Sequence, residues 1–208
     1  MKSLIIIGAG GHGRVVADIA QKMGVYKTIA FLDDRNITET MGFPVVGKVS
    51  DVQKYVDGGD IFVAIGDSYV RESLVNRLLQ INANIPVLIH PSAIVGACVE
   101  IGLGTAVMAG AIINPCAKIG KGVILNTSCS VDHDCVIDNF AHISVGAHVA
   151  GAVNIGEYAW IGAGAVVKNN INISANCIIG AGAVVVKDVL ETGIYVGVPA
   201  KKCKELRR

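Results

Sequence analysis

Three adjacent titratable side chains, Asp132, His133 and Asp134, lie in a stretch of sequence that otherwise consists mainly of small and apolar residues. An imidazole beside a carboxylate is a pairing that general bases use, because the carboxylate fixes the ring tautomer and raises the basicity of the ring. Such a base removes the proton that an amine must lose when it attacks a carbonyl carbon. We therefore expect His133 to be a general base with Asp134 as its partner, although a solvated turn is an open alternative.

Two more polar residues are spaced close to this segment. His142 follows His133 by nine residues, and Asn126 precedes it by seven. We expect these side chains to form a polar site on one side of the element that carries them. No serine or cysteine stands in a recognisable nucleophile setting, which favours direct transfer over a covalent intermediate.

A second candidate site lies near the start of the chain, where Gly8, Gly10 and Gly13 match the pattern G-x-G-x-x-G. Backbone N–H groups of such a turn, at the start of a helix, attract phosphate. Asp33 follows at the spacing typical of dinucleotide-binding folds, but the 85 or so residues available are too few for both halves of that fold. A single nucleotide diphosphate is thus favoured over NAD or an empty turn, and the imidazole of His12 supports a site.

The elements that must position these residues have two different periods. From residue 89 onward, 17 positions spaced six residues apart, from Ile89 to Val185, are all Ile, Val or Leu. The residue four positions after each of them, from Ala93 to Val189, is Ala, Val, Cys, Thr or Ile. A six-residue period is typical of a parallel β-helix, in which each hexad makes one short strand and one turn. The sequence predicts such a helix over residues 89–208, with a C-terminal tail.

Residues 1–88 alternate between strand and helix patterns. Strands are expected at residues 4–7, 28–32, 60–65 and 85–88, and helices at 14–23 and 70–81. This alternation predicts an α/β domain with a small parallel sheet, resembling half of a Rossmann fold.

Composition excludes several classes of function. The net charge of +1 creates no field that attracts nucleic acid, and no apolar run reaches the length of a membrane span. The apolar run at the start is too short for a signal peptide and reads as a buried strand. Six cysteines without a CxxC pair favour reduced thiols, so we expect a cytoplasmic protein that contacts neither nucleic acid nor membrane.

Six short motifs together resemble one family. GAGGHG, FLDD, AIGD, NTSCSVDHDCVI, AHISVGAHVAG and GVPAK are similar to segments of the bacterial nucleotide-sugar N-acetyltransferases of the bacillosamine and perosamine type, with their sialic acid O-acetyltransferase relatives. These are hexapeptide-repeat acyltransferases. The resemblance implies a left-handed β-helix, a homotrimer, a nucleotide-activated amino sugar as substrate and acetyl-CoA as co-substrate, with no metal.

The resemblance also implies roles for individual residues. It makes His133 the general base, with Asp134, where the family often has Glu, raising its basicity, and it places Asn126 in the same site. It implies that acetyl-CoA contacts His142, Ala163 and Ala181. It implies that the sugar nucleotide is held by Gly10, Gly11, His12, Asp33, Asp34 and Gly66.

Alternative functions remain open at this point. O-acetylation of a sialic-acid-like sugar uses the same kind of base. A zinc site formed by His133, His142 and His148, as in γ-type carbonic anhydrases, is a more distant alternative, as is a scaffold or nucleotide sensor without catalysis. Residues 18 apart stack on one face of a β-helix, and the face from Glu100 to Asn172 is the most polar. We expect that face to be exposed and the other two to contact neighbouring chains.

Overall fold

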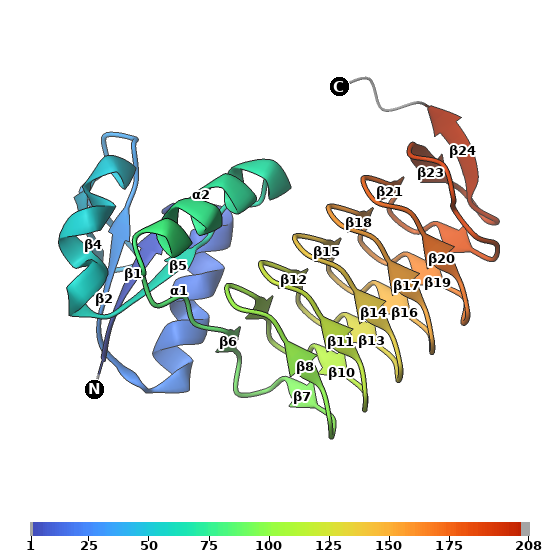
Figure 1. Cartoon of the computed structure of the whole chain (residues 1–208), viewed down its shortest axis with the longest axis horizontal. Helices are drawn as coiled ribbons and strands as arrows, with labels where there is room; N and C mark the ends of the chain where they lie inside the picture. The colour runs from blue at the N-terminus through green and yellow to red at the C-terminus, as the bar shows by residue number, and fades with distance from the viewer. Residues whose placement is uncertain (1, 205–208) are drawn as a thin grey trace. The chain divides into compact units, whose positions relative to one another are not determined.

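The computed structural model describes residues 2–204, so that Met1 and residues 205–208, the end of the expected tail, lie outside the described residues. The chain divides into two compact units, Met1–Pro91 and Ser92–Arg208 (Figure 1). The boundary falls three residues after the expected residue 88, just beyond His90.

The first unit is built on a five-stranded sheet in the order β3-β4-β2-β1-β5. Its strands are β1 (Lys2–Ile7), β2 (Tyr26–Leu32), β3 (Glu39–Thr40), β4 (Phe43–Gly47) and β5 (Asp60–Val63). Strands β1, β2, β4 and β5 run parallel, and β3 pairs antiparallel with β4. The interior strand β1, between β2 and β5, is buried from Leu4 to Ile7, as the run of aliphatic residues predicts for a strand covered on both faces.

Two α-helices and one 3-10 helix complete this unit: α1 (Gly11–Met23), η1 (Val49–Gly58) and α2 (Ser68–Gln80). Helix α1 packs against β1 and β2, and α2 packs against β5. Helix α1 begins three residues before the expected Arg14. Its first turn contains Gly11 and Gly13, and glycine is not typical of helices, so the sequence pattern does not indicate this turn. At Gly13 a Cβ atom would lie 1.9 Å from the carbonyl oxygen of Gly8, so the helix approaches the preceding loop more closely than any side chain permits.

Two parts of the first unit differ from the sequence expectation. The segment 39–58 contains β3, β4 and η1, which were not expected, because the strands are short and β4 contains Pro44. The last strand, β6, covers Leu88–Ile89 and not residues 85–88. Pro86 has no N–H group to donate to a strand ladder, which prevents pairing earlier in that segment.

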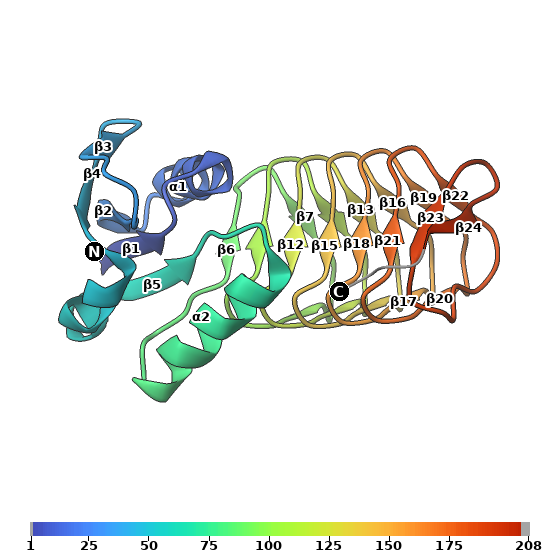
Figure 2. The same ribbon diagram turned by 90° about the horizontal axis from the view of Figure 1, so that it is seen from above.

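The second unit is a parallel β-helix of two-residue strands, whose three sheets we call I, II and III (Figures 1 and 2). Sheet I contains β7 (Ile94–Val95), β10 (Ile112–Ile113), β13 (Ser130–Val131), β16 (His148–Val149), β19 (Val166–Val167) and β22 (Val184–Val185). Sheet II contains β8 (Glu100–Ile101), β11 (Lys118–Ile119), β14 (Val136–Ile137), β17 (Asn154–Ile155) and β20 (Asn172–Ile173). Sheet III includes β9 (Ala106–Val107), β12 (Ile124–Leu125), β15 (His142–Ile143), β18 (Trp160–Ile161) and β21 (Ile178–Ile179). Strands in each sheet pair parallel with the strand 18 residues away, as the hexad period predicts.

The interior of the β-helix is filled by the residues that the period singled out. The aliphatic residues from Val107 to Val185 and the small residues from Thr105 to Val189 are all buried. Corners between sheets require a left-handed backbone, which is found at glycines such as Gly164 and Gly182 and at non-glycine residues such as Asp134 and Asn176. Aspartate and asparagine tolerate this conformation best among residues with a side chain.

The helix ends with β23 (Ile194–Val196), which extends sheet III, and β24 (Lys201–Lys204), which pairs antiparallel with β23. Within residues 2–204, no helix has both the length and the apolar character needed to cross a lipid bilayer.

Candidate active site

The corner between β13 and β14, where the chain passes from sheet I to sheet II, carries His133. Asp134 follows it with a φ of 59°, and this left-handed turn brings the Asp134 side chain beside the imidazole. The Nδ1 atom of His133 lies 2.7 Å from Oδ2 of Asp134. The hydrogen bond places the ring proton on Nδ1 and leaves Nε2 as the proton acceptor.

A second carboxylate also acts on this corner. Oδ1 of Asp132 accepts hydrogen bonds from the Asn114 side-chain amide at 2.7 Å and from the backbone N–H of His133 at 2.8 Å. These bonds, that from Asn114 above all, lower the pKa of Asp132 and keep it ionised. The hydrogen bond that His133 donates to Asp134, followed by the charge of Asp132, raises the pKa of His133. The imidazole is therefore a stronger base than a free histidine, and its side chain is 60% exposed to solvent.

One coil further along, Gly151 lies directly beneath the His133 ring. A Cβ atom at Gly151 would lie 2.6 Å from Nε2, so only glycine allows the ring its present position. The backbone supports the same arrangement, because Ala152 N–H donates to the His133 carbonyl at 2.9 Å. Sequence reasoning missed both Asn114 and Gly151, although each lies 18 residues from a residue of the expected site and the hexad register identifies them.

A second polar cluster lies at the corner between sheets III and I. The Asn126 amide oxygen accepts the Thr127 N–H at 2.8 Å, and its amide nitrogen lies 3.1 Å from Nε2 of His142. Because the amide nitrogen donates, Nε2 of His142 accepts, and the ring proton of a neutral His142 is on Nδ1. The indole of Trp160 stacks on this ring with the centroids 5.6 Å apart and holds its plane.

The two alanines expected to contact acetyl-CoA follow the same corner. Ala163 comes after β18 and Ala181 after β21, one coil apart, and both are exposed. The carbonyl oxygen of Ala163 accepts the N–H of Gly182 at 2.8 Å, which ties the two coils together. Asn126, His142, Ala163 and Ala181 thus line one edge of the β-helix.

The two clusters lie at different corners of a single chain. His133 and Asp134 occupy the corner between sheets I and II, whereas Asn126 and His142 lie at or beside the corner between sheets III and I. The expected grouping of these residues on one side of the prism is therefore wrong for one chain. Each hexad lies on the next of the three sheets, so residues one hexad apart point in different directions. Sheet I lies between the clusters, with a shallow cavity of about 250 Å³ lined by Asn114, Ser130, Asp132, His148, Val149, Ala150, Val166 and Val167.

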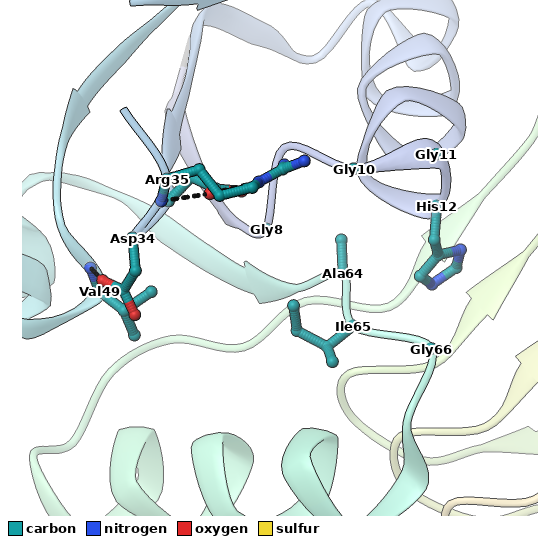
Figure 3. A pocket seen from close by; sticks show the side chains of 11 residues that line it. Gly8, Gly10, Gly11, His12, Asp34, Arg35, Val49, Ala64, Ile65 and Gly66 are labelled. Carbon is teal, nitrogen blue, oxygen red and sulfur yellow. Dashed lines mark hydrogen bonds and ion pairs between the residues drawn. The ribbon is translucent and has the colours of Figure 1, made fainter. Parts of the chain in front are cut away.

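The first unit contains a larger cavity of about 400 Å³ (Figure 3). It brings together all six residues expected to hold a sugar nucleotide, together with Gly8 of the glycine pattern and four residues that sequence reasoning did not single out for binding. The lining is formed by Gly8, Gly10, Gly11, His12, Asp33, Asp34, Arg35, Val49, Ala64, Ile65 and Gly66. Most of these residues lie in the loops that follow β1, β2 and β5 or in the first turn of α1, at the carboxyl ends of parallel strands, where open α/β sheets bind their ligands. Val49 is the first residue of η1.

His12 lines this cavity on the side of Gly66 (Figure 3), and Arg71, whose charge acts on His12, lies outside that lining. Burial, together with the nearby Arg71 charge, lowers the pKa of His12 to about 4, so the imidazole is neutral at physiological pH. Its Nε2 atom is buried, and within the described structure it has no hydrogen-bond partner. The buried Arg71 guanidinium donates to the carbonyl oxygens of Ile65 and Gly66 at 2.9 and 2.8 Å, which fixes the loop opposite α1.

Metal ligation was one of the alternatives for the histidines. Across residues 2–204, no group of three or more His, Cys, Asp or Glu side chains is arranged to hold a metal ion. His142 and His148 lie on different sheets, III and I, and His148 Nδ1 is 2.8 Å from the Ser130 hydroxyl.

Comparison with known proteins found a family model and a curated relative that match parts of the chain. The model of the PglD N-terminal domain family matches residues 3–78. A curated UDP-N-acetylbacillosamine N-acetyltransferase from Bacillus subtilis (strain 168) is 36% identical over 113 residues, which are 52% of this chain and 52% of that protein. The alignment therefore spans about half the length of this curated relative.

Solved structures match over nearly the whole chain. The acetyltransferase domain of PglB from Neisseria gonorrhoeae FA1090 has a TM-score of 0.95 and 40% identity, with 98% of this chain and 100% of that chain covered. A mutant of perosamine N-acetyltransferase from Caulobacter crescentus, solved with CoA and GDP-perosamine, has a TM-score of 0.94 and 36% identity, with 99% and 98% covered. The fold expected from the sequence, an α/β domain with a small parallel sheet followed by a left-handed parallel β-helix, is confirmed. The chain belongs to the bacterial nucleotide-sugar N-acetyltransferases of the bacillosamine and perosamine type, a family of hexapeptide-repeat acyltransferases.

Proposed function

We propose that the protein transfers the acetyl group of acetyl-CoA to the amino group of a nucleotide-linked amino-deoxy sugar. The observation that carries this proposal is the 2.7 Å contact between His133 and Asp134, which makes an exposed imidazole a general base. The relatives support the substrate classes, since one of the PglB domain structures contains acetyl coenzyme A and the perosamine enzyme was solved with GDP-perosamine.

The chemistry follows from the tautomer of His133. The sugar amine attacks the thioester carbonyl carbon, and Nε2 of His133 accepts the proton that the amine nitrogen loses. The tetrahedral adduct then collapses, the C–S bond breaks, and the imidazolium returns its proton to the thiolate sulfur. The products are the N-acetylated sugar nucleotide and CoA with a free thiol, and the base is regenerated without an acyl-enzyme.

Acetyl-CoA is proposed to lie along the edge formed by His142, Ala163 and Ala181. A His142 ring that carries its proton on Nδ1 is a donor for the thioester carbonyl oxygen, where negative charge develops in the transition state. Asn126 contributes by fixing this tautomer through its bond to Nε2.

The sugar nucleotide is proposed to bind in the first unit. The cavity there is lined by Gly10, Gly11, His12, Asp33, Asp34 and Gly66, all of which the sequence resemblance singled out. Residues 1–88 would thus act as the nucleotide-sugar-binding domain and residues 89–208 as the acyltransferase domain.

A homotrimer is proposed because the two polar clusters lie at different corners of one chain. A neighbouring chain that packs against sheet I or III brings its own His142 edge toward the His133 corner. Sheet I exposes the apolar residues Ile94, Ile112 and Val166, with Ser130 and His148 between the last two, and sheet III exposes Trp160. Sheet II carries Glu100, Lys118, Asn154 and Asn172 on its exposed side and is proposed to face solvent. We propose a cytoplasmic location, where acetyl-CoA and nucleotide sugars are available.

The direct test is a transfer assay on the purified protein. Acetyl-CoA is combined with 4-amino sugars linked to UDP, GDP or dTDP, and with a sialic-acid-like sugar as the competing hydroxyl acceptor, while release of the free CoA thiol is measured. We expect turnover with an amino sugar nucleotide only. His133→Ala is expected to lower kcat by about 10²- to 10⁴-fold while acetyl-CoA still binds. Turnover on the hydroxyl acceptor alone, or an unchanged His133→Ala rate, contradicts the proposal.

A further inference from the structure

The carboxylate of Asp33 is fully occupied by the protein itself. Its Oδ1 accepts the backbone N–H of Arg35 at 2.9 Å and the Arg35 Nε–H at 2.8 Å. Its Oδ2 accepts the Ala9 N–H at 2.7 Å and the Arg35 Nη2–H at 2.8 Å. A carboxylate offers about four lone-pair positions, so these four donors leave no further acceptor for a ligand.

This arrangement changes the role that the position of Asp33 suggests. In dinucleotide-binding folds an acidic residue at this point of the second strand accepts hydrogen bonds from ribose hydroxyls. Asp33 is 7% exposed, and the Arg35 hydrogen bonds, the largest cause, hold its pKa far below the usual range. It remains ionised and bonded to Arg35, and its contribution to the cavity is to hold the guanidinium in one orientation.

Arg35 has donors left over after this pairing. A guanidinium carries five N–H bonds in one plane, and Asp33 uses one from Nε and one from Nη2, which leaves three. The Arg35 side chain is 58% exposed, and Figure 3 shows that it extends across the cavity toward Gly10. Its Nη2 atom lies 3.9 Å from the point where a Cβ atom of Gly10 would be.

The opposite wall of the same space is the amino end of α1. This 13-residue helix has no acidic residue in its first turn, and its N-cap residue Gly10 provides no side-chain cap. A Cβ atom at Gly11 would meet nothing within 4 Å, so a ligand can approach the backbone N–H groups closely. Next to them lies the buried Nε2 atom of His12, unpartnered in the described structure, which marks a place where a ligand atom completes the hydrogen bonding.

We propose that Arg35 is a binding residue that clamps the diphosphate of the nucleotide sugar against the amino end of α1, with Asp33 as its positioning residue. The proposal rests on the proposed function, since it assigns part of the proposed substrate site. Guanidinium groups and helix amino ends both favour phosphate, and their opposed placement suits the two charges of a diphosphate.

The two ends of the cavity differ in chemistry, which indicates how the ligand is oriented. Asp34 lies on the far side from Gly10, where its Oδ1 accepts the Val49 N–H at 3.0 Å (Figure 3). A carboxylate repels phosphate but accepts hydrogen bonds from ribose hydroxyls or base N–H groups. The nucleoside is therefore assigned to the Asp34 side, the diphosphate to Arg35 and Gly10, and the sugar to the His12 and Gly66 side.

Calorimetric titration with UDP, UMP, uridine and inorganic pyrophosphate tests the assignment, with the GDP series in parallel. Arg35→Ala is expected to weaken diphosphate binding by about 10- to 100-fold and to leave nucleoside binding unchanged. Arg35→Lys is expected to recover only part of the loss, because it keeps the charge without the planar pair of donors. Lys54→Ala is the matched control, since Lys54 is a cation of the same unit paired with Asp51 outside the cavity.

A double-mutant cycle tests the role of Asp33. Made in the wild-type protein, Asp33→Asn is expected to reduce the difference between the affinities for UDP and for uridine. Made in the Arg35→Ala variant, the same substitution is expected to leave that difference unchanged. Equal loss of UDP and uridine binding in folded Arg35→Ala, or unchanged UDP binding, overturns the proposal. The transfer assay distinguishes the failure of one proposal from the failure of the other. If the wild-type protein binds diphosphates but acetylates no amino sugar, only the proposed function is contradicted. If Arg35→Ala has an unchanged KM for the sugar nucleotide, only the assignment of Arg35 is contradicted.

Discussion

The Nδ1 atom of His133 lies 2.7 Å from a carboxylate oxygen of the very next residue, Asp134. Neighbouring side chains in an extended strand point to opposite faces and cannot meet in this way. The left-handed φ of 59° at Asp134 turns both toward the same side of the corner. The turn that passes the chain from one sheet to the next thus also builds the base.

Replacing Asp134 by Asn is expected to shift the acidic limb of the pH–rate profile to lower pH. The Asp134 hydrogen bond is the largest cause of the raised pKa of His133, and catalysis requires the neutral ring. Removing the carboxylate lowers that pKa, so the ring stays neutral to lower pH, while its weaker basicity reduces the maximal kcat.

The measurement is kcat against pH for wild type, Asp134→Asn and Asp134→Glu. The glutamate variant keeps the carboxylate and is expected to have a limb close to that of wild type. An acidic limb at the same pH in all three proteins shows that Asp134 only forms the turn.

Replacing Gly151 by Ala is expected to lower kcat with little change in the melting temperature. The new methyl group would lie 2.6 Å from Nε2 of His133, and the exposed ring can rotate away from it. A displacement of about 1 Å is enough to cost about 10²-fold in rate.

Gly156→Ala is the matched comparison, because its methyl group would lie 2.5 Å from the backbone nitrogen of Ala175 and has no imidazole to displace. We expect this variant to lower the melting temperature, as overpacking does. Thermal melts and kcat values for both variants separate the two effects, and a Gly151→Ala protein with wild-type kcat argues against the ring position described here.

Replacing Asn126 by Ala is expected to raise the KM for acetyl-CoA by about three- to tenfold. The His142 ring then loses the donor at Nε2 and populates both tautomers, so its Nδ1 proton is present only part of the time. Nitrogen NMR of the His142 ring reports the tautomer directly.

Asn139→Ala provides the control, since Asn139 is another corner asparagine whose amide bonds to Glu157 and the Lys121 N–H, away from His142. A similar KM in Asn126→Ala and Asn139→Ala, together with an unchanged NMR spectrum, shows that Asn126 does not set the tautomer.

Mixing two inactive variants tests whether the site is shared between chains. His133→Ala and His142→Ala are each expected to be inactive alone, because each lacks one of the two clusters. If His133 and His142 of one site come from different chains of a trimer, equal co-expression of the variants restores about a quarter of the wild-type sites.

The double variant His133→Ala/His142→Ala, co-expressed with an inactive single variant, is the control and is expected to restore nothing. Recovery no greater than this control shows that each site lies within one chain. Light scattering gives the chain number of the same samples.

Much of the second unit was predictable because its period is strict. The residues that fill the prism, from Val107 to Val185, follow from one count along the sequence. The same count places Asn114 beside Asp132 and Gly151 beneath His133, yet neither residue type signals a role by itself. Their importance depends on the distance between adjacent coils, which a list of motifs does not contain.

The first unit was less predictable because its binding residues lie on loops without a period. The position of Asp33 suggested an acceptor for the ligand, whereas its bonds to Arg35 and Ala9 show an acceptor already filled. Only the side-chain geometry separates a carboxylate that meets a ligand from one that orients an arginine. The role of the buried Arg71 was not predictable either. It donates to the carbonyl oxygens of Ile65 and Gly66, and no sequence motif links an arginine to carbonyl groups five and six residues before it.

The pairing of each strand with the strand 18 residues away has a consequence for inherited length changes. Deleting or inserting one residue between Asn114 and Gly151 rotates every later side chain off its face and separates the base from the glycine beneath it. Deleting or inserting a complete coil between Gly151 and Val185 leaves the faces before and after it aligned. Along this part of the gene, tolerated changes in length are therefore expected in whole coils of about 54 nucleotides, the count that keeps three strands per turn.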